Sequence, residues 1–375
     1  MTTYKPYGVQ ELQALLQQAE KQGVSVMTGG RQGSGFHIDF QNWNKIREID
    51  LMNLTVTVER AVTLGELEDA VQAQGLHMAA VTEDLRNVSI GDFFAEQMFC
   101  LTSLHHNQPR FQVLGLEVML ADGTLLSVAG KTVKNVTGYD MCRFYISNRE
   151  QFAIPLVFTI KLVSPEPMQL MLEADLPHAE VLCDWVKALR RQRIVPQVCL
   201  YWNKAASVLL QRREQQGKLI LVCTGSKQRL ERELQILSQL ADELQLGLQV
   251  CEQPEQIWQE IAALRSHTVW QDGLKVPSLQ CPALLPVLEE QQIGCWYNPM
   301  QGSLQLIPPQ GTAELYKQLY DQAVALGGAG NWYYMDSYGF APEIETRLWR
   351  SLKQQFDGGQ RLNCRETGGG FHGTK

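Results

Sequence analysis

Four glycines fall within eight residues, Thr28–Gly35 (TGGRQGSG), directly after a short β-rich run at Val24–Met27. Glycine lets the backbone turn where other residues cannot, and it lets the backbone approach a ligand closely. Loops of this kind bind phosphates because their backbone N–H groups can face the anion. The same cluster also fits an ordinary turn. The surrounding elements therefore have to decide between a phosphate loop and a turn.

The residues around this loop alternate between helix and strand signals. Leucines at helical spacing predict a helix over 10–22, which Gly23 would end. Alternating apolar residues predict a strand over 54–59. The capping box Thr63–Glu66 then opens a second helix, and Gly75 is its stop signal.

A hairpin and a strand complete this first part, after a segment, 77–109, that shows no periodicity. Asp122-Gly123 stands between two apolar runs, which is a strong hairpin signal. An apolar strand follows over 152–163 and ends before Pro165. We expect a domain boundary after residue 165.

The second part begins with two strand–helix–strand units. Their predicted elements are strands over 168–176, 194–202, 218–225 and 246–252 and helices over 179–190 and 227–243. That order is typical of a ferredoxin-like α+β layer. A hairpin with Gly302 near its turn is expected over 293–307, and helices over 313–326 and 342–356. No internal repeat of fixed period is evident, and the tail from Cys364 is expected to be flexible.

Composition narrows the class of protein. The 33 basic and 40 acidic side chains give a net charge of −7, which predicts no nucleic-acid partner. The nine cysteines are scattered without a C-x-x-C pair, so we expect reduced thiols and neither a metal set nor disulfides. No signal region and no membrane-spanning run is evident, and the expected location is cytoplasmic.

Several stretches, in order, resemble one family. They are LTVTVERAVTLGELEDAVQAQGL, VLGLEVMLADGTLLSVAGKTVKNVTGYDMCRF, LKVPSLQCPALLPVLEEQQIGCWYNPMQGSLQL and SLKQQFDGGQRLN. They are similar to FAD-binding proteins of the vanillyl-alcohol-oxidase (PCMH) type, and most of all to the FAD-binding E subunits of bacterial glycolate dehydrogenases. The most specific likeness is the signature over 131–143.

The resemblance implies an α+β fold with a two-lobed PCMH-type FAD-binding domain over 1–165. It implies a ferredoxin-like cap domain over 166–340, and a C-terminal helix and tail over 341–375 that return to the FAD domain. The implied cofactor is FAD, and the implied role is flavin electron transfer in glycolate or similar 2-hydroxy acid oxidation. The implied partners are a catalytic D subunit and an iron–sulfur subunit.

In this family two glycine-bearing loops wrap the flavin pyrophosphate with backbone amides. The residues that the resemblance assigns to the cofactor are Gly29, Gly30, Arg31, Gly33, Ser34, Ser89, Gly91, Lys134, Gly138 and Tyr139. It assigns no catalytic residue and no metal ligand in this chain. Arg31 stands where a small residue is expected, and it fits either a phosphate contact or a surface turn.

Two segments depart from the family pattern. The second loop reads Ser89-Ile-Gly-Asp-Phe-Phe94, so Asp92 stands where a glycine is expected. A carboxylate about 4 Å from a phosphate charge would repel it by roughly 4 kcal/mol at an effective dielectric near 20. The third family segment appears as Asn148–Phe152, where the glycines are missing and Glu150 adds a negative charge. Asp92 therefore disfavours flavin unless it points away from the phosphates.

These departures leave an alternative, a family member that lost FAD and serves as a structural or assembly subunit. The signature residues Lys131, Lys134, Asn135, Gly138, Tyr139, Asp140 and Arg143 are compatible with both. In the structural interpretation Asp140 and Arg143 form an ion pair that holds strands together. A third hypothesis, a sugar-acid or cell-wall precursor oxidase acting alone, lacks the expected catalytic groups.

The histidines offer little other chemistry. His105 and His106 are adjacent, and side chains on an extended chain point to opposite faces, so they are expected to be exposed loop residues. Some relatives attach flavin to a histidine, but nothing local favours His37 or His105 in that role. His178 and His267 stand singly in the expected cap domain, and no G-x-S-x-G elbow is present.

Overall fold

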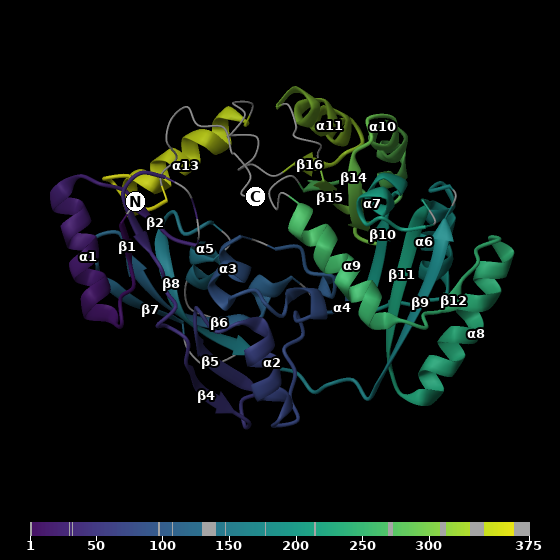
Figure 1. Ribbon diagram of the computed structural model, residues 1–375, viewed down its shortest axis with the longest axis horizontal. Coiled ribbons are helices and arrows are strands. Elements are labelled where there is room, and N and C mark those ends of the chain that lie inside the picture. The colour runs from purple at the N-terminus through teal and green to yellow at the C-terminus, as the bar shows by residue number, and fades with distance from the viewer. Residues whose placement is uncertain are drawn as a thin grey trace.

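The computed structural model describes residues 2–29, 31, 33–96, 98–106, 108–129, 140–146, 148–176, 178–213, 215–268, 273–307, 313–330 and 341–363. These residues form two lobes, with helix α9 (Pro254–His267) lying between them (Figure 1). The first lobe contains all described strands up to residue 161, and the second begins with the strand at residue 168.

The first lobe contains two sheets. The smaller sheet is parallel, with the order β1 (Thr2–Tyr4), β3 (Phe36–Ile38), β2 (Val26–Met27). The larger sheet is antiparallel, with the order β4 (Ile46–Asp50), β5 (Thr55–Glu59), β8 (Ala153–Lys161), β6 (Val113–Leu120), β7 (Leu125–Ala129). The helices are α1 (Val9–Gln22), α2 (Leu64–Gln72), α3 (Ile90–Ala95), α4 (Ser103–His106), α5 (Met141–Tyr145) and the 3₁₀ helices η1 (Glu83–Leu85) and η2 (Pro109–Phe111).

The helix predictions for this lobe are confirmed. α1 buries Leu12, Leu16 and Ala19, and Gly23 ends it in the left-handed conformation with φ +64°. Thr63 and Glu66 form the expected reciprocal capping box at the start of α2. Local signals decided these helices because their caps and apolar stripes are contiguous in the chain.

The Asp122-Gly123 hairpin is also confirmed. Strands β6 and β7 pair antiparallel on either side of it, and Gly123 has φ +86°. The strand signal at 24–27 gives only the two residues of β2. The expectation of irregular structure over 77–109 was incomplete, because η1, α3, α4 and η2 lie there. Their short length leaves no periodic pattern to detect.

The second lobe is built on one eight-stranded sheet. Its order is β12 (Gln249–Val250), β9 (Met168–Leu176), β11 (Gly217–Gly225), β10 (Val198–Trp202), β14 (Gly294–Asn298), β15 (Ser303–Ile307), β13 (Leu274–Lys275), β16 (Ala329–Gly330). Its helices besides α9 are α6 (Val181–Arg191), α7 (Lys204–Leu209), α8 (Lys227–Glu243), η3 (Cys281–Leu284), α10 (Leu285–Glu290) and α11 (Ala313–Ala325).

The predicted ferredoxin-like layer is confirmed, and it occurs twice. The first unit is β9–α6–β10–β11–α8–β12, and the second is β13–α10–β14–β15–α11–β16. The two units meet where β10 pairs with β14, at Tyr201–Tyr297 and Trp202–Trp296. All four of these aromatic side chains are buried. The repeat escapes sequence periodicity because the first unit contains the extra helix α7, so the two units differ in length.

The helix α9 was missed by the sequence analysis. It opens with Pro254 and buries Ile257, Ile261 and Leu264, but its hydrophobic stripe is weak. It packs against η1 of the first lobe. Its position was therefore set by contacts between lobes that no local pattern reports.

The end of the described chain returns to the first lobe. Helix α13 (Glu343–Phe356) places Phe356 against Phe144 and Phe152. The buried Lys353 donates from Nζ to the Gln151 carbonyl at 2.6 Å and pairs with Asp357 at 2.7 Å. Beyond the helix, Leu362 bridges to Val26 in β2. The predicted flexible tail from Cys364 lies outside the described residues.

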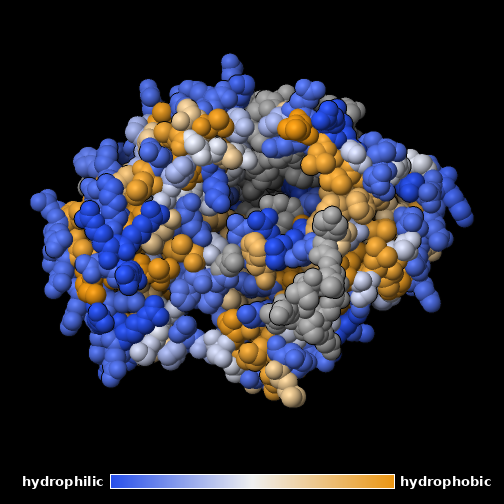
Figure 2. Space-filling view, turned by 180° about the vertical axis from the view of Figure 1, so that it is seen from behind, coloured by the Kyte–Doolittle hydropathy of each residue, from blue (hydrophilic) through white to orange (hydrophobic). Residues whose placement is uncertain are grey.

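Figure 2 shows one face of the molecule, on which hydrophobic residues form several separate groups among hydrophilic ones. Among the described residues, no helix combines the length and hydropathy that crossing a bilayer requires. The eight described cysteines are free thiols, and all but Cys183 are buried.

Candidate functional site

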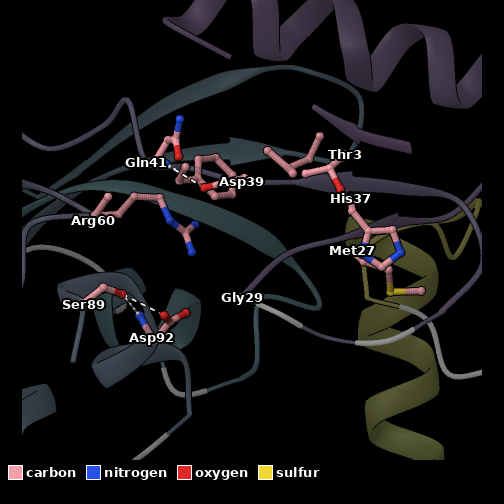
Figure 3. A pocket seen from close by; sticks show the side chains of 12 residues that line it. Thr3, Met27, Gly29, His37, Asp39, Gln41, Arg60, Ser89 and Asp92 are labelled. Carbon is pink, nitrogen blue, oxygen red and sulfur yellow. Dashed lines mark hydrogen bonds between the residues drawn. The ribbon is translucent and has the colours of Figure 1, made fainter. Parts of the chain in front are cut away.

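A pocket of about 440 Å³ lies between the smaller sheet and the start of α3 (Figure 3). This volume falls within the usual range for small-molecule sites. The lining residues are Thr3, Met27, Gly29, His37, Ile38, Asp39, Phe40, Gln41, Arg60, Ala61, Ser89 and Asp92. Gly29, Ser89 and Arg60 approach it from three different segments, which are the first glycine loop, the cap of α3 and the end of β5.

The first glycine loop follows β2, as expected, and it turns sharply. Gly29 has φ +61°, and a Cβ there would lie 3.0 Å from both Arg31 Nη1 and Asp92 Oδ1. At Gly33 a Cβ would lie 2.5 Å from Met27 Cε. The left-handed φ favours glycine at position 29, whereas the atom nearest to a Cβ at position 33 is the flexible end of the Met27 side chain. Gly30 lies outside the described residues, and Ser34 lies in the same loop.

Arg31 does not lie on the surface as a simple turn residue. Its Nη1 donates to the Thr28 carbonyl at 2.9 Å and to Thr28 Oγ1 at 3.0 Å. Its backbone N–H also donates to the Thr28 carbonyl, at 3.3 Å. The side chain is 17% exposed and forms ion pairs with Glu96 and Glu150. Arg31 is thus folded back across its own loop.

The second predicted loop is the start of a helix. The Ser89 hydroxyl accepts from the Asp92 N–H at 3.1 Å and donates to Asp92 Oδ2 at 2.9 Å. The Gly91 N–H donates to the Arg60 carbonyl at 2.8 Å. A Cβ on Gly91 would lie 3.0 Å from Arg60 Nε. These two amides, at 91 and 92, are therefore already hydrogen-bonded within the chain.

Asp92 does not point away from the first loop. Its Oδ1 lies beside the Cα of Gly29, and the carboxylate lines the pocket. Phe93 and Phe94, which follow it, are buried in the core of the first lobe. The helix start therefore packs its two aromatic side chains inward and leaves the Asp92 carboxylate at the seam between the two loops.

Five charged side chains form an alternating series beside this seam, which we name the charge chain: Arg149, Glu96, Arg31, Glu150 and Arg60. Arg149 donates to Glu96 Oε2 from Nε at 2.9 Å and from Nη2 at 2.8 Å. Glu96 Oε1 pairs with Arg31 Nη2. Arg31 Nη1 lies 3.7 Å from Glu150 Oε2, and Glu150 Oε1 lies 2.7 Å from Arg60 Nη2.

The charge chain is buried and held from several sides. The Glu150 and Arg60 side chains are 1% and 3% exposed. The Arg60 guanidinium lies over the Phe40 ring, 3.9 Å from its centroid, and donates from Nη1 to the Pro155 carbonyl at 3.0 Å. Glu150 also accepts from the Thr28 hydroxyl. Arginine and carboxylate planes match well, so this arrangement fixes both loops relative to the larger sheet.

The turn that carries Glu150 holds two non-glycine residues in the left-handed conformation. Arg149 and Glu150 have φ +59° and +57°. A left-handed conformation costs a non-glycine residue roughly 1–2 kcal/mol. Asn363 Nδ2 donates to both carbonyls of this pair, at 3.2 and 3.1 Å. The buried ion pairs and Asn363 together hold a conformation that the residue types do not favour.

Part of the predicted site lies outside the described residues. This applies to Lys134, Gly138 and Tyr139 of the signature, and to Lys131 and Asn135. The expected Asp140–Arg143 ion pair is present, at 2.9 Å. It was expected to hold strands together, but Asp140 caps α5 and both side chains are nearly half exposed. The pair is local because its partners are three residues apart on one helix.

The expectation of exposed loop histidines was wrong for His105 and His106. They lie on α4 and are partly buried, with His105 Nδ1 3.3 Å from His106 Nε2. Burial, together with the charge of His105, lowers the pKa of His106 to about 4. His37, which no local signal favoured, lies in the pocket wall and contacts the Gly33 carbonyl at 2.9 Å. Within the described residues no group of three or more His, Cys, Asp or Glu could hold a metal.

Comparison with known proteins decides what this pocket belongs to. Residues 3–129, which include every lining residue, match the model of the FAD binding domain family. Over this segment the chain is similar to FAD-binding domains. The match and the flavoprotein relatives support FAD as its cofactor.

Two relatives indicate the wider family. The chain is 27% identical over 177 residues to the glycolate oxidase subunit GlcD of Bacillus subtilis, covering 47% of this chain and 38% of that protein. It is 28% identical over 197 residues to a D-2-hydroxyglutarate dehydrogenase of Xanthomonas citri, covering 50% and 42%. The chain spans less than half the length of either relative. At this low identity, the matched part of the chain is similar to parts of a glycolate oxidase subunit and a 2-hydroxy acid dehydrogenase.

A solved structure confirms the fold over almost the whole chain. p-Cresol methylhydroxylase superposes with a TM-score of 0.73 at 14% identity, covering 96% of this chain and 87% of that one. The expected α+β fold, a two-lobed PCMH-type FAD-binding domain with a ferredoxin-like cap domain, is therefore correct.

The pocket and its arginines test the fit of FAD. Arg60 and the Gly29 backbone line the pocket, and Arg31 in the first loop adds a second positive charge of the kind that binds phosphate. Glu96 and Glu150 already bind these arginines, and Asp92 faces the same seam. The arginines therefore suit a diphosphate in place and in chemistry, and a bound diphosphate would replace the carboxylates that they now bind.

Proposed function

We propose that this chain is the FAD-binding subunit of a glycolate dehydrogenase-type complex that oxidises a 2-hydroxy acid. The observation that carries the proposal is the pocket between the smaller sheet and α3, which lies entirely within the segment that matches the FAD family. In this proposal a catalytic D-type subunit and an iron–sulfur subunit work beside it. The relatives named for glycolate and D-2-hydroxyglutarate support 2-hydroxy acids as the substrate class.

The residues of this chain would bind and position the cofactor. Arg31 and Arg60 would balance the phosphate charge, Gly29 would admit the close approach, and the Ser89 hydroxyl lines the same pocket. Of the remaining proposed contacts, Gly33, Ser34 and Gly91 lie in the same two loops. When bound, FAD supplies the redox centre, and the protein orients it and tunes it.

The division of the chain belongs to the same proposal. We propose the FAD-binding domain over 1–165, the cap domain over 166–340 and a returning C-terminal part over 341–375. The contact of Lys353 with the Gln151 carbonyl supports that return. We also propose a cytoplasmic location, for which the scattered free thiols are the support.

The visible absorption spectrum tests this function. We would purify the chain alone and co-expressed with its genomic neighbours, and record the spectrum before and after reduction. A yellow protein with oxidised-flavin bands that bleach on reduction is the expected result. A colourless protein in both preparations, which takes up no added FAD, would exclude the flavin role.

A structural or assembly subunit without flavin is the second candidate, and one observation favours it. In the charge chain every arginine is bound to a carboxylate of the same chain, so the charges of these arginines are compensated without a ligand. The colourless result above, combined with co-purification of the neighbouring subunits, would support this role.

A further inference from the structure

The charge chain lies between the two loops that border the pocket. Arg60 lines the pocket itself, and Arg31 belongs to the first glycine loop. Each of these arginines is bound by Glu150, and Arg31 also by Glu96. The positive groups that an anionic ligand would use are thus occupied by two carboxylates of the same chain.

We propose that Glu96 and Glu150 are built-in competitors for the diphosphate of the cofactor, and that they set its affinity by occupying Arg31, Arg60 and Arg149. This inference rests on the proposed function, because FAD brings the diphosphate. With both glutamates in place, the site has a lower affinity for diphosphates than its arginines alone would give it.

The charges at the seam nearly cancel before any ligand binds. Three guanidinium groups face two carboxylates, so the charge chain has a net charge of +1. Asp92 at the same seam brings the local sum to zero. A diphosphate adds at least two negative charges, which nothing in this local set balances while both glutamates remain ionised and in place.

The geometry allows carboxylate and phosphate to compete directly for the same arginines. A guanidinium binds carboxylate and phosphate oxygens through the same planar N–H groups, so one group displaces the other without rebuilding the arginine side chain. Glu96 is 13% exposed, so its carboxylate has a route outward, whereas Glu150 is 1% exposed. Glu96 is therefore the first of the two to be displaced.

The test uses the variants Glu96→Gln and Glu150→Gln, which keep the shape of each side chain and remove its charge. The matched control is Glu260→Gln, because Glu260 forms an ion pair with Arg212 at similar burial, 12% and 13% exposed, on α9 in the other lobe. Binding of inorganic pyrophosphate is measured by calorimetry in phosphate-free buffer, and binding of FAD by the change in flavin fluorescence.

The expected result is that each seam variant binds pyrophosphate about tenfold or more tightly than the wild type, while the control stays within about twofold. A second expected readout is the thermal midpoint. Removing one carboxylate leaves a buried arginine poorly compensated, so the variants unfold earlier than the wild type and gain more from added pyrophosphate. If Glu150→Gln does not fold, the more exposed Glu96→Gln carries the test.

Equal pyrophosphate affinity in the wild type and both seam variants would overturn the inference, as would weaker binding in the variants. The FAD titration separates this from the proposed function. Tight FAD binding by all four proteins without difference supports the function and overturns the competition. A gain for pyrophosphate with no FAD binding in any protein excludes the flavin role and overturns FAD as the ligand, while it shows that the glutamates compete with a diphosphate.

Discussion

Asp84 and Arg265 form a buried ion pair between the two lobes. Arg265 Nε lies 2.5 Å from Asp84 Oδ2. The Arg265 side chain is 3% exposed and the Asp84 side chain 0%. Arg265 also donates from Nη1 to the Phe99 carbonyl at 2.9 Å, and its guanidinium lies over the Trp296 ring. This one residue of α9 therefore contacts η1, the segment after α3 and the second ferredoxin-like unit.

The substitution Asp84→Asn is expected to lower the free energy of unfolding by about 3–5 kcal/mol, because it leaves the buried Arg265 charge without its partner. Urea denaturation followed by tryptophan fluorescence measures the change. The control is Asp69→Asn. Asp69 pairs with Arg86, which is 30% exposed, so the loss in free energy of unfolding is expected to stay below about 1 kcal/mol. Equal effects of the two substitutions would contradict the role assigned to the pair.

Lys353→Met is expected to detach α13 and the residues that follow it from the first lobe. It removes the donor to the Gln151 and Leu362 carbonyls and leaves the Asp357 carboxylate buried without a cation. The expected loss is about 3–5 kcal/mol, with faster proteolytic cleavage within α13. Lys317→Met, in the exposed pair with Asp321, is the control and should behave as the wild type. Unchanged proteolysis of the Lys353 variant would show that the return is held by other contacts.

The loss of folding stability at acid pH should depend on His106. Its pKa is lowered from 6.5 to about 4, mainly by burial and then by His105 and His77, so the unfolded state takes up a proton more readily than the folded state. Stability from this group is complete above about pH 6.5 and is lost as the pH falls towards 4. We expect His106→Gln to flatten the fall of thermal midpoint across this range. The exposed His178→Gln is the control, and an identical pH profile in both variants would contradict the prediction.

Asp92→Asn is expected to strengthen binding of FAD or pyrophosphate on the order of tenfold, because the carboxylate faces the seam beside Gly29. The helix cap should survive, since the Ser89 hydroxyl accepts from the backbone N–H of residue 92. Titration calorimetry measures the affinity. Asp184→Asn on α6, where the carboxylate is 62% exposed, is the control. An unchanged affinity would mean that Asp92 does not reach the bound anion.

Gly302→Ala is expected to cost more than about 2 kcal/mol of stability. Gly302 has φ +72°, and a Cβ there would lie 1.8 Å from the Val276 carbonyl oxygen. Thermal unfolding monitored by circular dichroism measures the loss. Gly247→Ala is the matched control, because nothing lies within 4 Å of a Cβ at that position. If both variants unfold at the same temperature, the β14–β15 turn tolerates a side chain.

Several elements were determined by the sequence alone. The Thr63–Glu66 capping box, the Gly23 stop and the Asp122-Gly123 turn predicted their helices and hairpin correctly. Each of these signals acts within a few residues, so the chain needs no tertiary contact to express it. The first ferredoxin-like unit was predicted for the same reason, since the order of its elements is written along the chain.

The charge chain was decided by the tertiary structure. Arg31, Arg60, Glu96 and Glu150 stand in four separate segments, and no spacing predicts that they will meet. The sequence analysis named Glu150 as a negative charge beside the expected cofactor site, but it could not show that arginines would bind it. The same holds for Asp84 and Arg265, which are 181 residues apart. Long-range ion pairs depend on how whole elements pack, and local patterns contain no record of that packing.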